Sequence, residues 1–280
     1  MSILKSLKLF WERCLNELNN SGERPLINSK LEGVNHDLQF AYKIAASKIA
    51  NSASVLDYGC GGGYGTEYLS RFTKNAVEGF DPDVNTISQN RAFFKNAANL
   101  TFCHDQSELT RYDVVVFFQV IEHLDKEAIP QCLKEINNLL NDNGVLYLAT
   151  VNKNISSYKL EKPILPFHIY EFNPRELSDL LSKYFRDVRC YGQVDEEIIG
   201  KIQSGEWSYL RCHDLSFRSR LVRTISQIDF IRSIARRTPL FIKSFILGYR
   251  RAKQKQTNYM LTDVPLEIEN SYILIYEGKK

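Results

Sequence analysis

The sequence predicts an α/β fold: a doubly wound, mostly parallel sheet of seven strands with helices on both faces. Two observations lead to this prediction. Short apolar segments alternate with helical patterns between about residues 50 and 192, as they do in repeated strand–helix–strand units. The segment 112–118 is apolar almost throughout, which is typical of a central parallel strand covered on both faces.

Each expected strand is a short run rich in apolar residues, and the last is expected to be antiparallel to the others. The expected strands span 54–58, 76–80, 100–103, 112–118, 145–149, 187–191 and 271–276. The expected helices lie at 7–18, from Asn35, from about Tyr64, after a cap at Asp83 or Asn85, over 129–140 and from Asn173. Asn173, Pro174 and Glu176 match a capping box with proline at the first helical position.

These elements divide the chain into four parts. The parts are N-terminal helices at 1–50, a core at 51–192, a basic amphipathic helical insertion at 193–268, and the last core strand at 269–280. Between Arg218 and Lys255 the basic residues are opposed only by Asp229 and are interleaved with apolar residues, which predicts two amphipathic helices broken near Pro239. This helical pair is interpreted either as a lid packed on the core or as a contact for an anionic membrane face or a lipid-linked diphosphate sugar.

Composition excludes several other classes of protein. The net charge of +3 over 280 residues gives no reason to expect a nucleic-acid partner. The cysteines have no zinc-like spacing and are expected to be reduced, as in the cytoplasm. Residues 1–20 are too charged for a signal peptide, and no apolar stretch reaches the ~20 residues of a membrane span. The expected location is the cytoplasm, with peripheral contact at the inner face of the membrane if the insertion docks there.

A glycine-rich loop follows the first expected strand. Gly59, Gly61 and Gly63 fit G-x-G-x-G, whereas a dinucleotide fingerprint would require a small residue at Tyr64. A tight turn alone would not need five glycines within the seven positions 59–65. The carboxylate of Asp57 would repel a pyrophosphate but tolerate an ammonium and a sulfonium. The loop therefore predicts S-adenosylmethionine rather than a dinucleotide.

Further cofactor contacts are expected where the next strands end. Asp81 lies about twenty residues beyond the loop, where an acid can accept both ribose hydroxyls. Asp105 is a candidate for the adenine amino group, and Gln106 is a weaker one. Asp81 could instead mark an ordinary helix entry, and Asp105 a solvated turn. Pro82 and Gln119 complete the expected cofactor set.

Several segments of the sequence resemble the motifs of class I S-adenosylmethionine-dependent methyltransferases of the small-molecule type. They are Val55–Gly65, Val77–Val84, His104–Asp105, Tyr112–Leu124 and Leu139–Asn152. This resemblance covers about half the chain and implies a Rossmann-like fold and methyl transfer from S-adenosylmethionine.

More narrowly, the sequence resembles at three places the methyltransferases encoded with bacterial cell-surface polysaccharide genes. The segments are Gly22–Pro25, His36 and Pro166–Phe172. That resemblance implies methylation of a sugar hydroxyl or a glycan precursor in polysaccharide biosynthesis. The chain departs from the group at Gln39 and Phe40, where an Arg-Tyr pair is usual.

Candidate catalytic residues follow the fourth and fifth expected strands. They are Glu122, His123, His168 and Glu171. His123 is the first choice for a general base, since it follows the fourth strand directly and an imidazole can remove a proton near neutral pH. Glu122 could orient it, bind substrate or help to hold a metal, but one Glu-His pair offers too few ligands, and no metal site is predicted. Alternatively, Glu122 and His123 only cap a helix, and His168 and Glu171 belong to a packed loop.

Three functions remain open on sequence grounds. The first is methylation of a hydroxyl of a sugar or glycan precursor. The second is methylation of a quinone, lipid or natural product by the same core, with the insertion docking an apolar substrate. The third is a cofactor-binding scaffold without catalysis.

Overall fold

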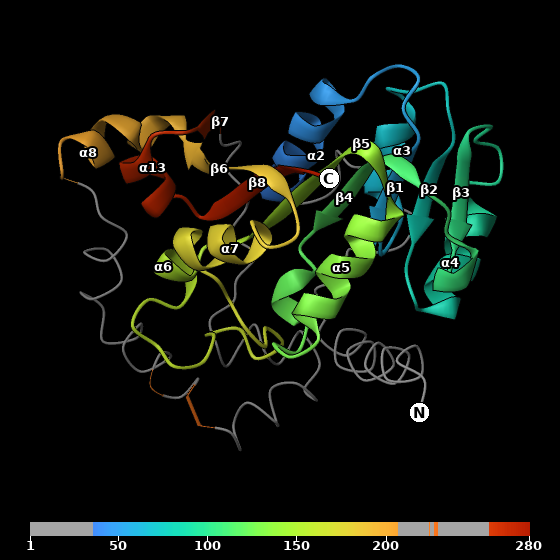
Figure 1. Ribbon diagram of the computed structural model, residues 1–280. Coiled ribbons are helices and arrows are strands. Elements are labelled where there is room, and N and C mark those ends of the chain that lie inside the picture. Colours follow the sequence, from blue (N-terminus) through green and yellow to red (C-terminus); the bar gives the residue numbers. More distant parts are fainter. Residues whose placement is uncertain (1–35, 207–223, 225–226, 229–257) are drawn as a thin grey trace.

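The computed structural model describes residues 36–206, 224, 227–228 and 258–280 (Figure 1). The expected helix at 7–18, the Gly22–Pro25 segment and nearly all of the basic segment Arg218–Lys255 lie outside the described residues. Within the described ranges, none of the helices combines the length and the apolar character that a membrane crossing requires.

The core is a single sheet of eight strands in the order β3-β2-β1-β4-β5-β8-β6-β7. The strands are β1 Val55–Tyr58, β2 Val77–Phe80, β3 Leu100–Cys103, β4 Tyr112–Phe118, β5 Leu140–Val151, β6 Arg186–Asp195, β7 Tyr259–Thr262 and β8 Ile273–Lys279. Strands β1 to β5 pair in parallel, and β8 lies antiparallel between β5 and β6. The Rossmann-like α/β class with an antiparallel last strand is confirmed.

The expected number of seven strands was wrong, because β7 adds an eighth. It pairs antiparallel with the end of β6, Gly192 opposite Thr262, at one edge of the sheet. Its apolar run, 259–261, is only three residues long, too short for the alternation of a strand to show in the sequence. Strand β6 also runs on to Asp195, past the expected end at residue 191, and thereby supplies the partner for β7.

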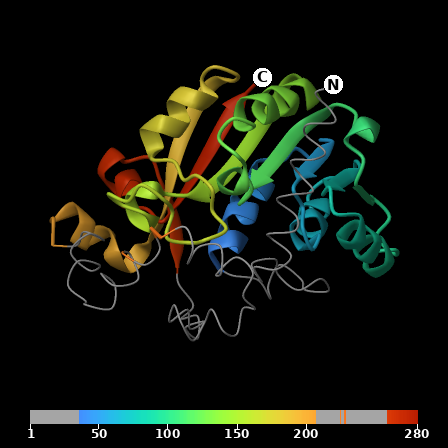
Figure 2. The same cartoon turned by 90° about the horizontal axis from the view of Figure 1, so that it is seen from below.

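Helices cover both faces of the sheet. They are α2 His36–Lys48, α3 Tyr64–Ser70, α4 Val84–Phe93, α5 Ile129–Leu139, α6 Lys153–Ser156, α7 Pro174–Leu181, α8 Ile199–Gln203 and α13 Pro265–Glu269. Figure 2 shows α5 and α7 on one side of the sheet and α2 on the other. Side chains of β4 alternate between these layers: Val114, Val116 and Phe118 join the core under α2, α3 and α4, while Val115 and Phe117 join the core under α5 and α7.

Local sequence signals explain where several helices begin. Asp83 caps α4 by accepting from the backbone N–H of Asn85, and the capping box of Asn173 and Glu176 opens α7 as expected. Helix α3 begins directly after Gly63, whose φ of 73° lies in the left-handed region. The helix expected over 129–140 ends one residue early, since Leu140 already pairs with Tyr112 as the first residue of β5.

The strand order indicates that the candidate site lies outside the carboxyl ends of β1 and β4. Strand β1 pairs with β2 on one side and with β4 on the other, so the connections after β1 and β4 leave toward opposite faces of the sheet. Ligands of open α/β sheets bind in the crevice outside the carboxyl ends of strands at such a point. The glycine loop follows β1 there, and the 3₁₀ helix η3, Ile121–His123, follows β4.

Candidate functional site

The glycine loop is held in shape by hydrogen bonds from the neighbouring elements. The backbone N–H groups of Gly59 and Cys60 both donate to the carbonyl oxygen of Phe80 at the end of β2, at 2.7 and 2.9 Å. The side-chain amide of Asn90 on α4 donates to the carbonyl oxygen of Gly61 at 2.7 Å, and the N–H of Gly61 donates to Asp81 at 3.1 Å. The loop is therefore fixed before any ligand binds.

The glycines serve different purposes. A Cβ at Gly59 would lie 2.5 Å from Cγ2 of Val120, and one at Gly65 would overlap the ring of Tyr42, so these two glycines make room for the protein's own side chains. Gly61 differs: its φ is 49°, and among the described residues no atom lies within 4 Å of where its Cβ would stand. The missing side chain of Gly61 therefore leaves open space that a ligand can use.

Asp57 is buried beneath the loop, with 1% of its surface exposed. It accepts a hydrogen bond from Thr66 Oγ1 at 2.8 Å and two longer ones from the hydroxyl of Tyr42 at 3.2 and 3.3 Å. Burial raises the pKa of Asp57 to about 7, although the hydrogen bonds from Thr66 and Tyr42 act in the opposite direction. Sequence reasoning missed Tyr42 and Thr66, because the local sequence gives no sign of hydroxyl contacts to an acid 15 and 9 residues away.

Asp81 joins the loop to the helix that follows β2. It is 3% exposed, and its two carboxylate oxygens accept from the N–H groups of Gly61 and Asp83. Pro82, half-buried, lies between these two acids at the start of α4. Three carboxylates, those of Asp57, Asp81 and Asp83, are thus buried around one glycine loop. Such a corner favours a cationic ligand over a diphosphate.

The remaining expected cofactor residues are placed differently. Asp105 follows β3 and is exposed, and its carboxylate caps the 3₁₀ helix Gln106–Glu108 by accepting from Ser107. Gln106 donates to Glu135 on α5 at 2.8 Å. Gln119, between β4 and η3, has a φ of 55°, a left-handed conformation that costs a non-glycine residue about 1–3 kcal/mol and often marks a functional site.

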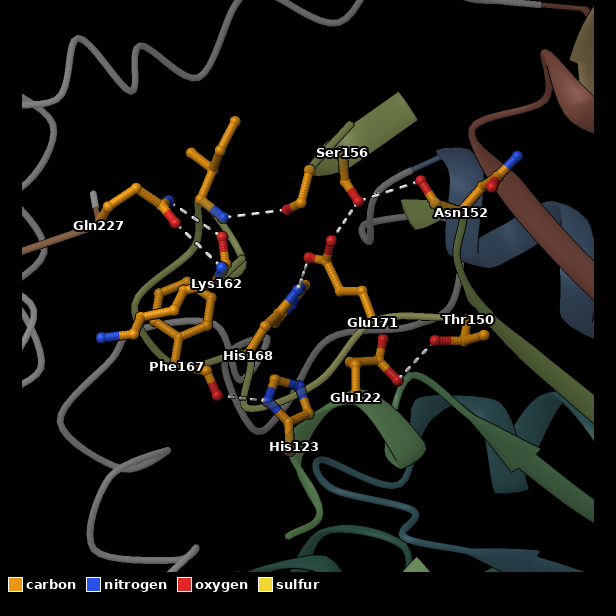
Figure 3. Close-up of polar contacts among 12 residues, drawn as sticks. Glu122, His123, Thr150, Asn152, Ser156, Lys162, Phe167, His168, Glu171 and Gln227 are labelled. Atoms are coloured by element: carbon orange, nitrogen blue, oxygen red, sulfur yellow. Dashed lines mark hydrogen bonds and ion pairs between the residues drawn. The ribbon is translucent and has the colours of Figure 1, made fainter. Parts of the chain in front are cut away.

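The four candidate catalytic side chains meet in one buried cluster, hereafter the Glu-His cluster: Glu122, His123, His168 and Glu171 (Figure 3). Nδ1 of His168 lies 2.6 Å from Oε1 of Glu171, and the rings of His123 and His168 meet edge to face at 5.1 Å between centroids. Nδ1 of His123 lies 3.2 Å from the carbonyl oxygen of Phe167. His123 and His168 are 45 positions apart in the sequence, so spacing alone could not predict this contact.

The backbone of the connection after β5 is attached to Glu122. The N–H groups of Ile169 and Tyr170 both donate to the carbonyl oxygen of Glu122, at 2.8 and 3.3 Å. Gln227, a described residue of the expected insertion, exchanges two hydrogen bonds with the backbone of Lys162 on the same connection, at 3.0 and 3.1 Å (Figure 3). Gln227 therefore contacts the connection that carries His168.

Electrostatics distinguish the two acids of the Glu-His cluster. Burial raises the pKa of Glu122 to about 7, although attraction to His168 and a hydrogen bond from Thr150 act to lower it. Burial acts in the same sense on Glu171, but hydrogen bonds from His168 and Ser156 outweigh it and hold the pKa of Glu171 below its usual value. At the N-terminus of η3, the cap residue Val120 makes no side-chain capping hydrogen bond.

Comparison with known proteins finds curated relatives that are named as methyltransferases. A probable S-adenosylmethionine-dependent methyltransferase of Mycolicibacterium smegmatis is 37% identical over 134 residues, which is 45% of this chain and 49% of that protein. A ubiquinone biosynthesis O-methyltransferase of Pelagibacter ubique is 30% identical over 42% of this chain and 50% of that protein. The chain spans about half the length of these curated relatives.

The solved structures agree on the fold. The 1,6-didemethyltoxoflavin-N1-methyltransferase of Burkholderia thailandensis, solved with 1,6-didemethyltoxoflavin and S-adenosylhomocysteine bound, superposes with a TM-score of 0.53 at 14% identity, covering 100% of this chain and 91% of that one. At that identity the likeness concerns the fold alone. Residues 32–186, more than half of the chain, match the family model described as a methyltransferase domain, and the chain therefore belongs to the methyltransferase domain family.

Proposed function

We propose that this chain transfers a methyl group from S-adenosylmethionine to a hydroxyl of a small-molecule acceptor. The observation that carries the proposal is the glycine corner, where Gly61 leaves open space beside the buried carboxylates of Asp57 and Asp81. These residues fit a ligand that carries an ammonium and a sulfonium. The Mycolicibacterium smegmatis relative, named as a probable S-adenosylmethionine-dependent methyltransferase, supports the same reading.

The Glu-His cluster lies at the neighbouring strand end and would handle the acceptor. S-adenosylmethionine supplies an electrophilic methyl carbon, which the acceptor oxygen takes by in-line displacement while the C–S bonding pair stays on sulfur and S-adenosylhomocysteine is released. His123 would take the hydroxyl proton at Nε2, since its contact with the Phe167 carbonyl oxygen places the ring hydrogen on Nδ1. Glu122 would orient the hydroxyl, and Glu171 would orient His168.

Two acceptor classes follow from different observations. The resemblance of His36 and the 166–172 segment to methyltransferases of polysaccharide gene clusters supports a sugar hydroxyl, in a glycan or its precursor. The Pelagibacter ubique relative, named as a ubiquinone biosynthesis O-methyltransferase, supports a phenolic hydroxyl of a quinone precursor instead. Turnover of nucleotide-linked or polyprenyl-linked sugars, set against turnover of phenols with an apolar tail, separates the two.

The activity test uses the full chain with S-adenosylmethionine and both acceptor pools. Release of S-adenosylhomocysteine that depends on an added acceptor is the expected result. Binding of S-adenosylmethionine without turnover on any acceptor would favour the scaffold, the third function open on sequence grounds. A His123→Ala variant serves as the matched control, since it should bind the cofactor and lose most of the turnover.

We also propose a cytoplasmic location with peripheral membrane contact through Arg218–Lys255. The support is the basic and apolar composition of that segment. Co-sedimentation with vesicles of anionic lipid should retain the full chain and release a variant in which Arg236, Arg237, Arg250 and Arg251 are alanine. Equal retention of both proteins would contradict the contact and favour a lid.

A further inference from the structure

Three side chains of the Glu-His cluster present ligand atoms to one point. Ligand atoms of Glu122, His123 and His168 all lie within 4.8 Å of one another. The three residues are 0%, 8% and 3% exposed. Two atoms bound to one ion at about 2.0–2.2 Å are at most ~4.4 Å apart, so small side-chain rotations bring this set into bonding range. The sequence showed only the adjacent Glu122 and His123, and the fold adds His168.

A hydrogen-bond acceptor lies at Nδ1 of each imidazole, that of His123 and that of His168. Nδ1 of His168 faces the carboxylate of Glu171 at 2.6 Å, and Nδ1 of His123 faces the carbonyl oxygen of Phe167 at 3.2 Å. An acceptor at Nδ1 fixes the neutral tautomer with its hydrogen there, so that the lone pair is on Nε2. Histidines that ligate metals nearly always have this arrangement, with a carboxylate or a backbone carbonyl on the second nitrogen.

Glu122 supplies an independent sign of a ligand. Oε2 accepts a hydrogen bond from Thr150 at 3.0 Å, but Oε1 is fully buried and, in the part of the chain that is described, has no hydrogen-bond partner (Figure 3). A buried carboxylate oxygen without a partner is costly, and native proteins rarely leave one unsatisfied. A cation bound between Oε1 and the two imidazoles would supply the missing interaction.

We propose that Glu122, His123 and His168 bind one divalent cation of the borderline first-row type, such as Zn²⁺, Mn²⁺, Fe²⁺ or Co²⁺. Two imidazoles and one carboxylate suit these ions, whereas Mg²⁺ and Ca²⁺ prefer oxygen ligands throughout. The catalytic meaning of the site rests on the proposed function: a bound cation would lower the pKa of the acceptor hydroxyl, and His123 would then be a ligand rather than the base.

The test is a titration of Co²⁺ into the metal-stripped full chain, followed by visible absorption, with equilibrium dialysis against Zn²⁺ and against Mg²⁺. One equivalent of Co²⁺ should bind, Zn²⁺ should compete for it, and Mg²⁺ should not. Glu122→Gln and His168→Gln should each weaken Co²⁺ binding at least ~10-fold, and Glu171→Gln by about 10–100-fold if it orients His168. Glu67→Gln and His104→Gln, matched substitutions away from the cluster, should bind as the parent does.

Thermal unfolding of each metal-free variant checks that it is folded. Co²⁺ bound equally by the parent and by folded Glu122→Gln and His168→Gln variants would overturn the site, as would no binding at all. Titration of S-adenosylmethionine on the same samples separates the two proposals. Cation binding without cofactor binding would sustain the site and contradict the proposed function. Full turnover by a metal-stripped chain that binds no Co²⁺ would sustain the function and overturn the site.

Discussion

A methyl group placed on Gly59 would lie 2.5 Å from Cγ2 of Val120, so the glycine loop and the segment that carries Glu122 and His123 are in direct contact. This contact joins the proposed cofactor corner after β1 to the Glu-His cluster after β4. The two halves of the site are therefore packed against each other where the connections after β1 and β4 leave the sheet.

Alanine substitutions should distinguish Gly59, which makes room for Val120, from Gly61, which leaves space for a ligand. Gly59→Ala should lower the free energy of unfolding by about 1–3 kcal/mol because the added methyl overlaps Val120, and by about 1 kcal/mol more because its φ of 89° is left-handed. Gly61→Ala should cost only about 1 kcal/mol, the strain of its left-handed backbone, yet weaken S-adenosylmethionine binding strongly. Urea unfolding and calorimetric titration measure the two effects. Unchanged cofactor affinity in Gly61→Ala would show that the ligand does not approach this glycine.

The raised pKa of Asp57 predicts a pH dependence of stability. Since its pKa is 3.8 in the unfolded chain and about 7 in the folded chain, the folded state binds more protons between these values. The contribution of Asp57 to stability is therefore present below about pH 4 and is lost as the pH rises toward 7. Asp57→Asn should flatten this part of the curve of unfolding free energy against pH. A curve of the same slope in both proteins would contradict the assignment.

The raised pKa of Asp57 also predicts how the affinity for S-adenosylmethionine varies with pH. A cationic cofactor favours ionised Asp57, so S-adenosylmethionine affinity should rise with pH up to about 7, by at most tenfold per unit, and then level off. Titrations at several pH values measure this. The rise should be absent in Asp57→Asn, and a rise of equal size there would assign it to another group.

His123→Ala tests the general base. Turnover should fall by roughly 10²–10⁴-fold while the dissociation constant for S-adenosylmethionine stays unchanged, because the proposed function assigns His123 to the acceptor hydroxyl and not to the cofactor. Single-turnover kinetics measure the rate of methyl transfer, and calorimetry measures the dissociation constant for S-adenosylmethionine. A variant that keeps full turnover would remove His123 from the chemistry.

The capping box of α7 gives a test of the fold apart from the site. Asn173→Ala removes the hydrogen bond to the N–H of Glu176 and should cost about 1 kcal/mol of unfolding free energy. Asn96→Ala, at an exposed position, is the matched control and should change stability by less than about 0.5 kcal/mol. Equal losses in both variants would show that the cap contributes nothing.

Much of the fold could be predicted because its signals are local. Apolar strands, the glycine loop and the caps at Asp83 and Asn173 depend on residues close together in sequence. Strand β7 was not predicted because it is only four residues long and its apolar run, 259–261, is too short to show a strand pattern. Tertiary contacts were not predicted for a different reason. The hydrogen bond from Asn90 to Gly61 and the contact of His123 with His168 depend on how distant segments pack.

The central claim is that the glycine corner binds a cationic adenosyl donor. The most direct measurement is calorimetric titration of the full chain with S-adenosylmethionine and, separately, with NAD. The acids around Gly61 predict that S-adenosylmethionine binds at least tenfold more tightly, a difference of about 1.4 kcal/mol or more. Tight binding of NAD with no heat from S-adenosylmethionine would contradict the account.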